Sequence, residues 1–150
     1  MPFTFTETEK AYIAGIVDGE GTVSIGQEAN GNFMVSLSIS NTFKPLIDWL
    51  SGKLNHKVYI LDKAHSRNEK WKILYTVVLS SHTAKELLEV VFPYLIVKRE
   101  HALVVLGFPL INKNERRLTE EEKLTRAICC VRMKALNRLG KEGGGENSPL

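Results

Sequence analysis

The sequence predicts a single α+β domain, and three features of its 150 residues support this class. An apolar pattern with helical spacing stands near the N-terminus. Two stretches follow in which apolar and polar residues alternate, as they do in half-buried strands. Longer helical patterns fill the second half of the chain, and with 43% hydrophobic residues the chain can bury a proper core. The predicted order is helix, two strands, helix, two strands and then helices.

The first helix is predicted to cover residues 7–18. Thr6 and Glu9 have the spacing of a capping box, in which each side chain accepts the backbone N–H of the other residue. The apolar residues that follow recur at helical intervals and are Tyr12, Ile13, Ile16 and Val17. Gly19 and Gly21 then favour the end of the helix.

A β-hairpin is predicted directly after this helix. Val23 and Ile25 alternate with polar residues, and Asn30 followed by Gly31 favours a tight turn. Residues 33–40 alternate apolar side chains with mostly small polar ones. The hairpin should therefore have one apolar and one polar face.

The later elements are predicted from the same signals. Pro45 suits the first turn of a second helix, and a second hairpin is expected from residues 57–63 and 71–79. A third helix should start at Thr83 and be interrupted by Pro93, and further helices are expected at 97–106 and 119–139. No linker divides the chain, so residues 1–139 are expected to form one domain, with the Gly-rich residues 140–150 as a flexible tail.

Charge and cysteine content limit the possible functions. The net charge of +3 and the pI near 8.9 permit DNA binding without requiring it. Residues 53–72 contain six basic residues against two acidic ones, although such runs are often only solvated. Cys129 and Cys130 are neighbours and suit packing better than a disulfide framework. We expect an intracellular protein in a reducing compartment, the cytoplasm or an organelle matrix, with no membrane span.

The nine residues Ile13 to Gly21 carry the strongest functional signal. They closely resemble the signature of the LAGLIDADG homing endonucleases, with Ala14, Gly15, Asp18 and Gly19 in matching places and Glu20 where the family has its final acidic residue. The resemblance covers about the first 110 residues. It implies an αββαββα homing-endonuclease core with an antiparallel β saddle, followed by extra C-terminal helices.

The resemblance also implies an activity. Such a chain is expected to be an intron-encoded, site-specific double-strand DNA endonuclease that leaves 3′-hydroxyl overhangs by metal-assisted phosphodiester hydrolysis. A single signature supplies half a catalytic centre, so we expect a homodimer and a long, pseudo-palindromic target. Two facing carboxylates call for a hard divalent cation, with Mg²⁺ the natural cofactor and Mn²⁺ or Ca²⁺ able to occupy the same site.

Individual residues receive roles from this pattern. Glu20 is expected to be catalytic and to bind metal, with the carbonyl of Gly19 as a further ligand. Lys98 stands in a segment that resembles the one that delivers the family's active-site lysine. Asn41 ends the second strand where relatives carry a polar side chain, and it is equally typical of a turn. Bare glycines four residues apart allow close helix contact, so the dimer interface is expected to contain Ala14, Gly15, Asp18 and Gly19.

The polar sides of the two hairpins are the candidate DNA face, because a β-ribbon fits the major groove and alternation directs every second side chain towards the bases. Each of these residues alone is equally compatible with simple solvation. The predicted DNA contacts are Ser24, Glu28, Asn32, Ser36, Ser38, Ser40, Lys57, Tyr59, Lys63, Arg67, Lys72 and Thr76.

Other interpretations use the same residues. A calcium loop around Gly21 fails, because Ile16 and Gln27 stand where an acidic first residue and a bidentate Glu are required. An intron RNA maturase, with the host intron RNA as partner, or a non-cleaving DNA-binding protein would keep the fold and lose the reaction. A small interaction module with a glycine-packed dimer helix would bind no nucleic acid. The four histidines have no ligand spacing and are expected at the surface or as caps.

Overall fold

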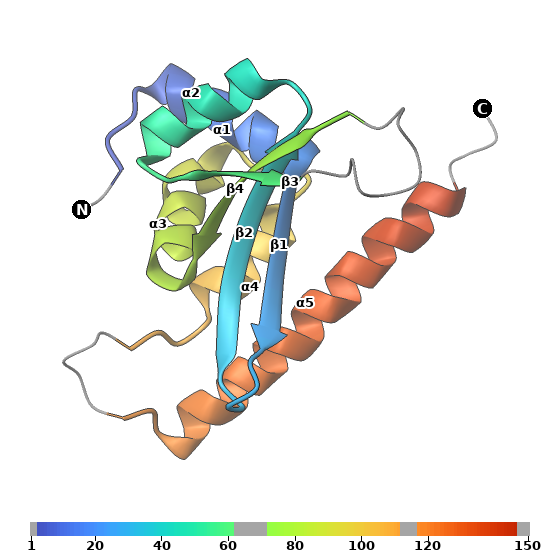
Figure 1. The fold of residues 1–150 in the computed structure, drawn as a ribbon. Coiled ribbons are helices and arrows are strands. Elements are labelled where there is room, and N and C mark those ends of the chain that lie inside the picture. Colours follow the sequence, from blue (N-terminus) through green and yellow to red (C-terminus); the bar gives the residue numbers. More distant parts are fainter. Residues whose placement is uncertain (1–2, 62–71, 112–116, 147–150) are drawn as a thin grey trace.

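The computed structural model describes residues 3–61, 72–111 and 117–146, the last six without their side chains. It confirms an α+β fold with one four-stranded antiparallel sheet. Figure 1 shows the arrangement. The elements are α1 (Glu7–Glu20), β1 (Gly21–Gln27), β2 (Phe33–Asn41), α2 (Lys44–Leu54), β3 (Val58–Leu61), β4 (Leu74–Ser80), α3 (Ser81–Val91), the 3-10 helix η2 (Phe92–Tyr94), α4 (Arg99–Leu106) and α5 (Glu120–Glu146).

The sheet has the strand order β1-β2-β4-β3, so the two hairpins meet through β2 and β4. Alternation works as the sequence predicts: Val35, Leu37 and Ile39 are buried on one face of β2. Helices α1, α2 and α3 pack on that face. Among the described residues, no helix covers the opposite face of the central strands. This face carries small polar side chains.

The first helix begins as predicted. Thr6 accepts the backbone N–H of Glu9, and Glu9 accepts that of Thr6, which completes the capping box. Its apolar side buries Ile13 and Val17 completely. The helix ends at Glu20, two residues beyond the predicted boundary, because the chain passes into β1 without a loop.

Helix α5 covers the outer edge of β1. The Cys130 thiol donates to the carbonyl oxygen of Ile25, and the Asn137 side-chain amide donates to that of Val23 over 2.9 Å. Edge carbonyls that would otherwise be open to another chain are thereby occupied. The helix continues past the predicted boundary at Leu139 to Glu146, because the strong helix formers before Gly140 favour propagation. The predicted helix end at residue 139 is therefore wrong, and the flexible tail at residues 140–150 stays a prediction.

His101 was expected at the surface, and this expectation is wrong. It is 9% exposed between α4 and α5, and its Nε2 lies 3.1 Å from the Asn137 side-chain oxygen. Burial lowers the pKa of the imidazole, and the nearby charge of Lys98 lowers it further. Helical spacing with Ala102, Val104 and Val105 placed it on the buried side of its helix.

No helix in the described part of the chain is long and apolar enough to cross a membrane.

Candidate active site and nucleic-acid face

Glu20 stands at the junction between α1 and β1, and Gly21 makes this junction possible. The backbone N–H of Gly21 donates to the carbonyl of Val17. A Cβ at position 21 would lie only 2.6 Å from that same oxygen, so any other residue would push the strand away from the helix. The tight passage leaves Glu20 exposed at the end of the helix.

Asp18 holds the segment that carries Lys98 against this junction. Its carboxylate accepts the backbone N–H groups of Ile96 and Lys98, each over 2.9 Å. Lys98 is therefore placed beside the last turn of α1 and is partly exposed. The expected role of Asp18 at a dimer interface did not include these bonds. They join residues 78 and 80 positions apart, and no local pattern in the sequence indicates them.

Asn41 reaches the same end of the sheet from β2. Gly21 pairs with Ile39, so Asn41 extends beyond the start of β1 towards the end of α1. Its side-chain oxygen accepts the backbone N–H of Phe43 over 2.7 Å. This bond gives Asn41 the turn role that the sequence also predicted as an alternative. The NH₂ group of its side chain remains available for catalysis. The catalytic role stays a prediction.

The donor atoms around Glu20 suit half of a hard-metal site. The last carbonyls of a helix lack intrahelical partners, and the helix dipole places partial negative charge there. Glu20 adds a full charge, and the last turn of α1 has no basic residue. A cation with oxygen ligands fits this donor set. Residues 3–61, 72–111 and 117–146 contain no group of three His, Cys, Asp or Glu that could hold a metal alone.

The basic residue nearest to Asn41 is used elsewhere. Lys44 forms an ion pair of 2.6 Å with Asp48 on α2, and its ammonium group lies 6.0 Å from the centre of the Tyr75 ring. Helix α2 therefore occupies this lysine within the chain. Lys98 is the basic residue that the described structure brings to the end of α1.

The predicted interface residues on α1 divide into two groups. Ala14 is fully buried inside the chain, so its assignment to a dimer interface is wrong. Gly15 and Gly19 are exposed on the opposite side of the helix, and nothing lies within 4 Å of a Cβ built on either. Exposed apolar side chains flank this bare surface on both sides: Tyr12 and Phe43 on one, Ile96 and Val97 on the other.

The open face of the sheet carries the predicted small hydroxyls. Register places Ser24 opposite Ser36, and Ser38 and Ser40 follow on the same face of β2. A hollow of about 550 Å³ lies across this face, lined by Ser38, Ser40, Tyr59, Leu61, Thr76, Val78 and Ser80. Thr76 corrects the prediction: it is only 6% exposed, and its hydroxyl donates to the carbonyl of Ile39 and accepts from Ser40. It supports the face from below and has little surface to offer DNA.

Basic and aromatic residues border the face near β3. The ammonium group of Lys57 lies 5.5 Å from the centre of the Tyr59 ring, and Lys72 is exposed just before β4. Lys63 and Arg67, which were also predicted to contact DNA, lie outside the described residues. The border of the open face near β3 is thus positively charged at Lys57 and Lys72.

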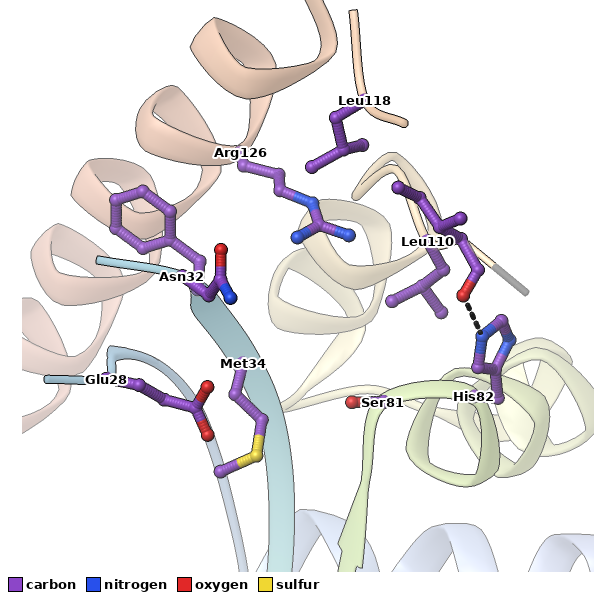
Figure 2. A pocket seen from close by; sticks show the side chains of 10 residues that line it. Glu28, Asn32, Met34, Ser81, His82, Leu110, Leu118 and Arg126 are labelled. Carbon is purple, nitrogen blue, oxygen red and sulfur yellow. Dashed lines mark hydrogen bonds between the residues drawn. The ribbon is translucent and has the colours of Figure 1, made fainter. Parts of the chain in front are cut away.

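Glu28 and Asn32 lie at the far tip of the first hairpin, about 26 Å along β1 from Glu20 by strand geometry. Figure 2 shows them around a cavity of about 610 Å³, together with Arg126 of α5 and His82 of α3. The Arg126 guanidinium is held by the carbonyl of Pro109 through Nε, and burial lowers its pKa. This cavity is separate from the candidate active site, which is a surface and not a pocket.

Comparisons with solved structures identify the fold. The chain superposes on the homing endonuclease I-CvuI in complex with its target in the presence of Ca, with 18% identity, a TM-score of 0.60 and coverage of 86% of this chain and 82% of that one. It also matches I-Vdi141I, an archaeal intron-encoded homing endonuclease complexed with DNA, at 14% identity and a TM-score of 0.64, covering 87% and 84%.

A third match names the family of the fold. The LAGLIDADG homing endonuclease I-GzeII, in complex with its DNA target, gives 14% identity and a TM-score of 0.56 over 84% of this chain and 43% of that one. No family model matches the sequence, and no curated protein matches it significantly. The chain therefore has the LAGLIDADG homing-endonuclease fold, which confirms the architecture expected from the signature.

Proposed function

We propose that the protein is a divalent-metal-dependent endonuclease that cuts both strands of a long, pseudo-palindromic DNA site. One observation carries this proposal: an exposed carboxylate, Glu20, stands at the end of the open sheet face, and Asp18 holds the backbone of Lys98 against the last turn of the same helix. A carboxylate and an ammonium group at the edge of a polar β surface suit phosphodiester hydrolysis. The fold, which this chain shares with DNA-bound homing endonucleases, supports the same function.

The open face suits a DNA groove. Its side chains alternate along the strands, so hydroxyls of Ser24, Ser36 and Ser38 point the same way and can meet base edges. Lys57 and Lys72 lie where they can contact phosphates. Small hydroxyls discriminate bases weakly, and specificity then depends on many contacts and on DNA shape.

The active form is a homodimer in this proposal. A single chain supplies one carboxylate to the site, whereas a two-fold pair would bring two copies of Glu20 together. Gly15 and Gly19 leave the backbone of α1 bare on its exposed side, and Tyr12, Phe43 and Ile96 provide apolar surface around it. Contact between the bare sides of two α1 helices would bury these exposed side chains.

Each residue has a defined task. Mg²⁺, when bound, lowers the pKa of a water ligand and stabilises the leaving 3′-oxygen. Glu20 and the Gly19 carbonyl hold the cation, and Lys98 neutralises the charge that develops on the phosphate. The side-chain amide of Asn41 orients a water molecule. The products carry 3′-hydroxyl overhangs.

A selection experiment tests the proposed activity. The protein is incubated with a library of randomised duplex DNA, with Mg²⁺ or with chelator, and both bound and cut fragments are sequenced. We expect one pseudo-palindromic consensus among the bound fragments and cutting of that consensus only with Mg²⁺. Binding without any cutting in Mg²⁺ would indicate a DNA-binding protein. Absence of DNA binding, with binding of structured intron RNA, would favour a maturase.

A further inference from the structure

Helix α5 presents two different faces along its length. The side that contacts the domain contains Cys129, Cys130 and Met133, which are at most 8% exposed, and Asn137 bonds to β1. These positions recur at helical intervals and account for the packing of the helix. Figure 1 shows α5 running past β1, with its C-terminal part extending away from the sheet.

The opposite side of α5 carries an unexpected apolar stripe. Leu124, Ile128 and Val131 are 62%, 51% and 68% exposed. Their spacing of four and three residues continues at Ala135, which is also exposed. Alternating steps of four and three define the seam of a coiled coil. A solvent-facing side normally carries polar residues, so an apolar seam here indicates a protein partner.

The charges along the same stripe define an orientation. Three acidic residues, Glu120, Glu121 and Glu122, occupy the first turn of α5. The second half of the helix exposes basic residues, which are Arg132, Lys134 and Arg138. Two parallel copies would place like charges side by side, whereas two antiparallel copies place acidic against basic ends.

We propose that α5 pairs with α5 of a second copy as a short antiparallel coiled coil. In the register that aligns the seam, Ile128 faces Val131 of the other copy and Leu124 faces Ala135. The next layer places Glu121 opposite Arg138. The large side chain of Leu124 thus packs against the small one of Ala135, and the acidic Glu121 lies opposite the basic Arg138. The two-fold axis repeats each of these pairs.

Nucleic acid is the less suitable occupant of this stripe. Phosphates would interact favourably with the basic half of α5. They would also lie against the apolar residues from Leu124 to Val131, with which they form no favourable interaction. The pairing joins two separate chains and is therefore concentration-dependent.

This surface is separate from the exposed side of α1. The proposal does not depend on nuclease activity, since it rests on α5 alone. Combined with a dimer formed through α1, it links two dimers in one particle.

Cross-linking between variants with one added cysteine each tests the register. Leu124→Cys and Ala135→Cys are made separately in the full chain, and both positions are exposed, so the core is untouched. A thiol-specific cross-linker with a short spacer is added to each variant and to their mixture. We expect a cross-linked dimer in the mixture and none with either variant alone. The native thiols, Cys129 and Cys130, are buried, and wild-type protein gives the background.

Two controls make the result decisive. A mixture of Gly52→Cys and Glu89→Cys, both at exposed sites on other helices, should give no product. Adding Ile128→Glu to both seam variants should abolish their product, with unchanged circular dichroism. Cross-linking of Leu124→Cys with itself would overturn the antiparallel register. Absence of product in the mixture at concentrations where the protein self-associates would overturn the proposal.

Discussion

At the residue scale, Asp18 links two parts of the candidate site. Its carboxylate accepts two backbone N–H groups, those of Ile96 and Lys98. A carboxylate can accept both because it has only acceptor atoms. The position of Lys98 beside the end of α1 therefore depends on the two acceptor oxygens of this side chain.

Replacing Asp18 by Asn should loosen this connection. An amide can accept only one of the two N–H groups through its oxygen, and its NH₂ group faces the other donor. We expect a loss of about 1–3 kcal/mol in the free energy of unfolding, measured by urea denaturation, together with slower DNA cutting. Asp48→Asn is the matched control, because Asp48 only forms an exposed ion pair with Lys44 and should cost less than about 0.5 kcal/mol. Equal losses for both variants would contradict this role.

Sequence reasoning identified some site residues and misplaced others. The signature correctly placed Glu20 at an exposed helix end and Gly15 on a free helix surface. The assignment of Ala14 to the interface was wrong because it took the whole motif as one surface. Only one side of a helix packed on a domain can face outward. The buried state of Thr76 depends on its bonds to Ser40 and Ile39, which arise only when β2 and β4 pair.

At the element scale, local patterns predicted each helix and strand with small errors at the ends. The capping box at Thr6 and the alternation in β2 are local signals, and both are confirmed. The hairpin was predicted directly after the first helix, but the extension of α1 to Glu20, with no residue between helix and strand, was not. It depends on close contact between Gly21 and Val17, which is a property of the backbone path and not of side-chain pattern.

A pair of glycine substitutions in β1 tests this contact. Gly21→Ala would place a methyl group 2.6 Å from the Val17 carbonyl oxygen, and we expect a loss of about 1–3 kcal/mol in unfolding free energy. Gly26→Ala lies on the same strand with nothing within 4 Å, and it should change stability by no more than about 0.5 kcal/mol. Urea denaturation of both proteins gives the comparison. A Gly21→Ala protein as stable as Gly26→Ala would show that the junction is not constrained.

At the scale of the whole molecule, the fold arranges one open sheet face and one bare helix side next to each other. Helices α1 to α3 cover the other face of the sheet and form the core. The α+β class was predictable because strand alternation left one polar face without a partner. The edge cover by α5 was not, because Asn137 and Val23 are far apart in the sequence.

A substitution on the bare side of α1 tests the proposed dimer. A Cβ at position 15 meets no atom within 4 Å in one chain, and in Gly15→Arg a better helix former should preserve folding. In a helix-to-helix dimer the same side chain would prevent contact. We expect a shift to smaller species in sedimentation velocity and a drop in DNA affinity of roughly tenfold or more. Gly52→Arg, on the exposed side of α2, is the matched control and should change neither property. An unchanged sedimentation profile for Gly15→Arg would exclude this surface as the dimer contact.

In the proposed function, Glu20 supports metal-dependent cutting of DNA. The most direct measurement compares wild type, Glu20→Gln and the exposed control Glu89→Gln on the selected DNA site, with binding and Mg²⁺-dependent cutting measured in parallel. We expect Glu20→Gln to bind the site and to cut it about 100-fold more slowly or not at all, a loss of at least about 2.7 kcal/mol in transition-state stabilisation. Glu89→Gln should behave as wild type. Cutting by Glu20→Gln at the wild-type rate would contradict the account.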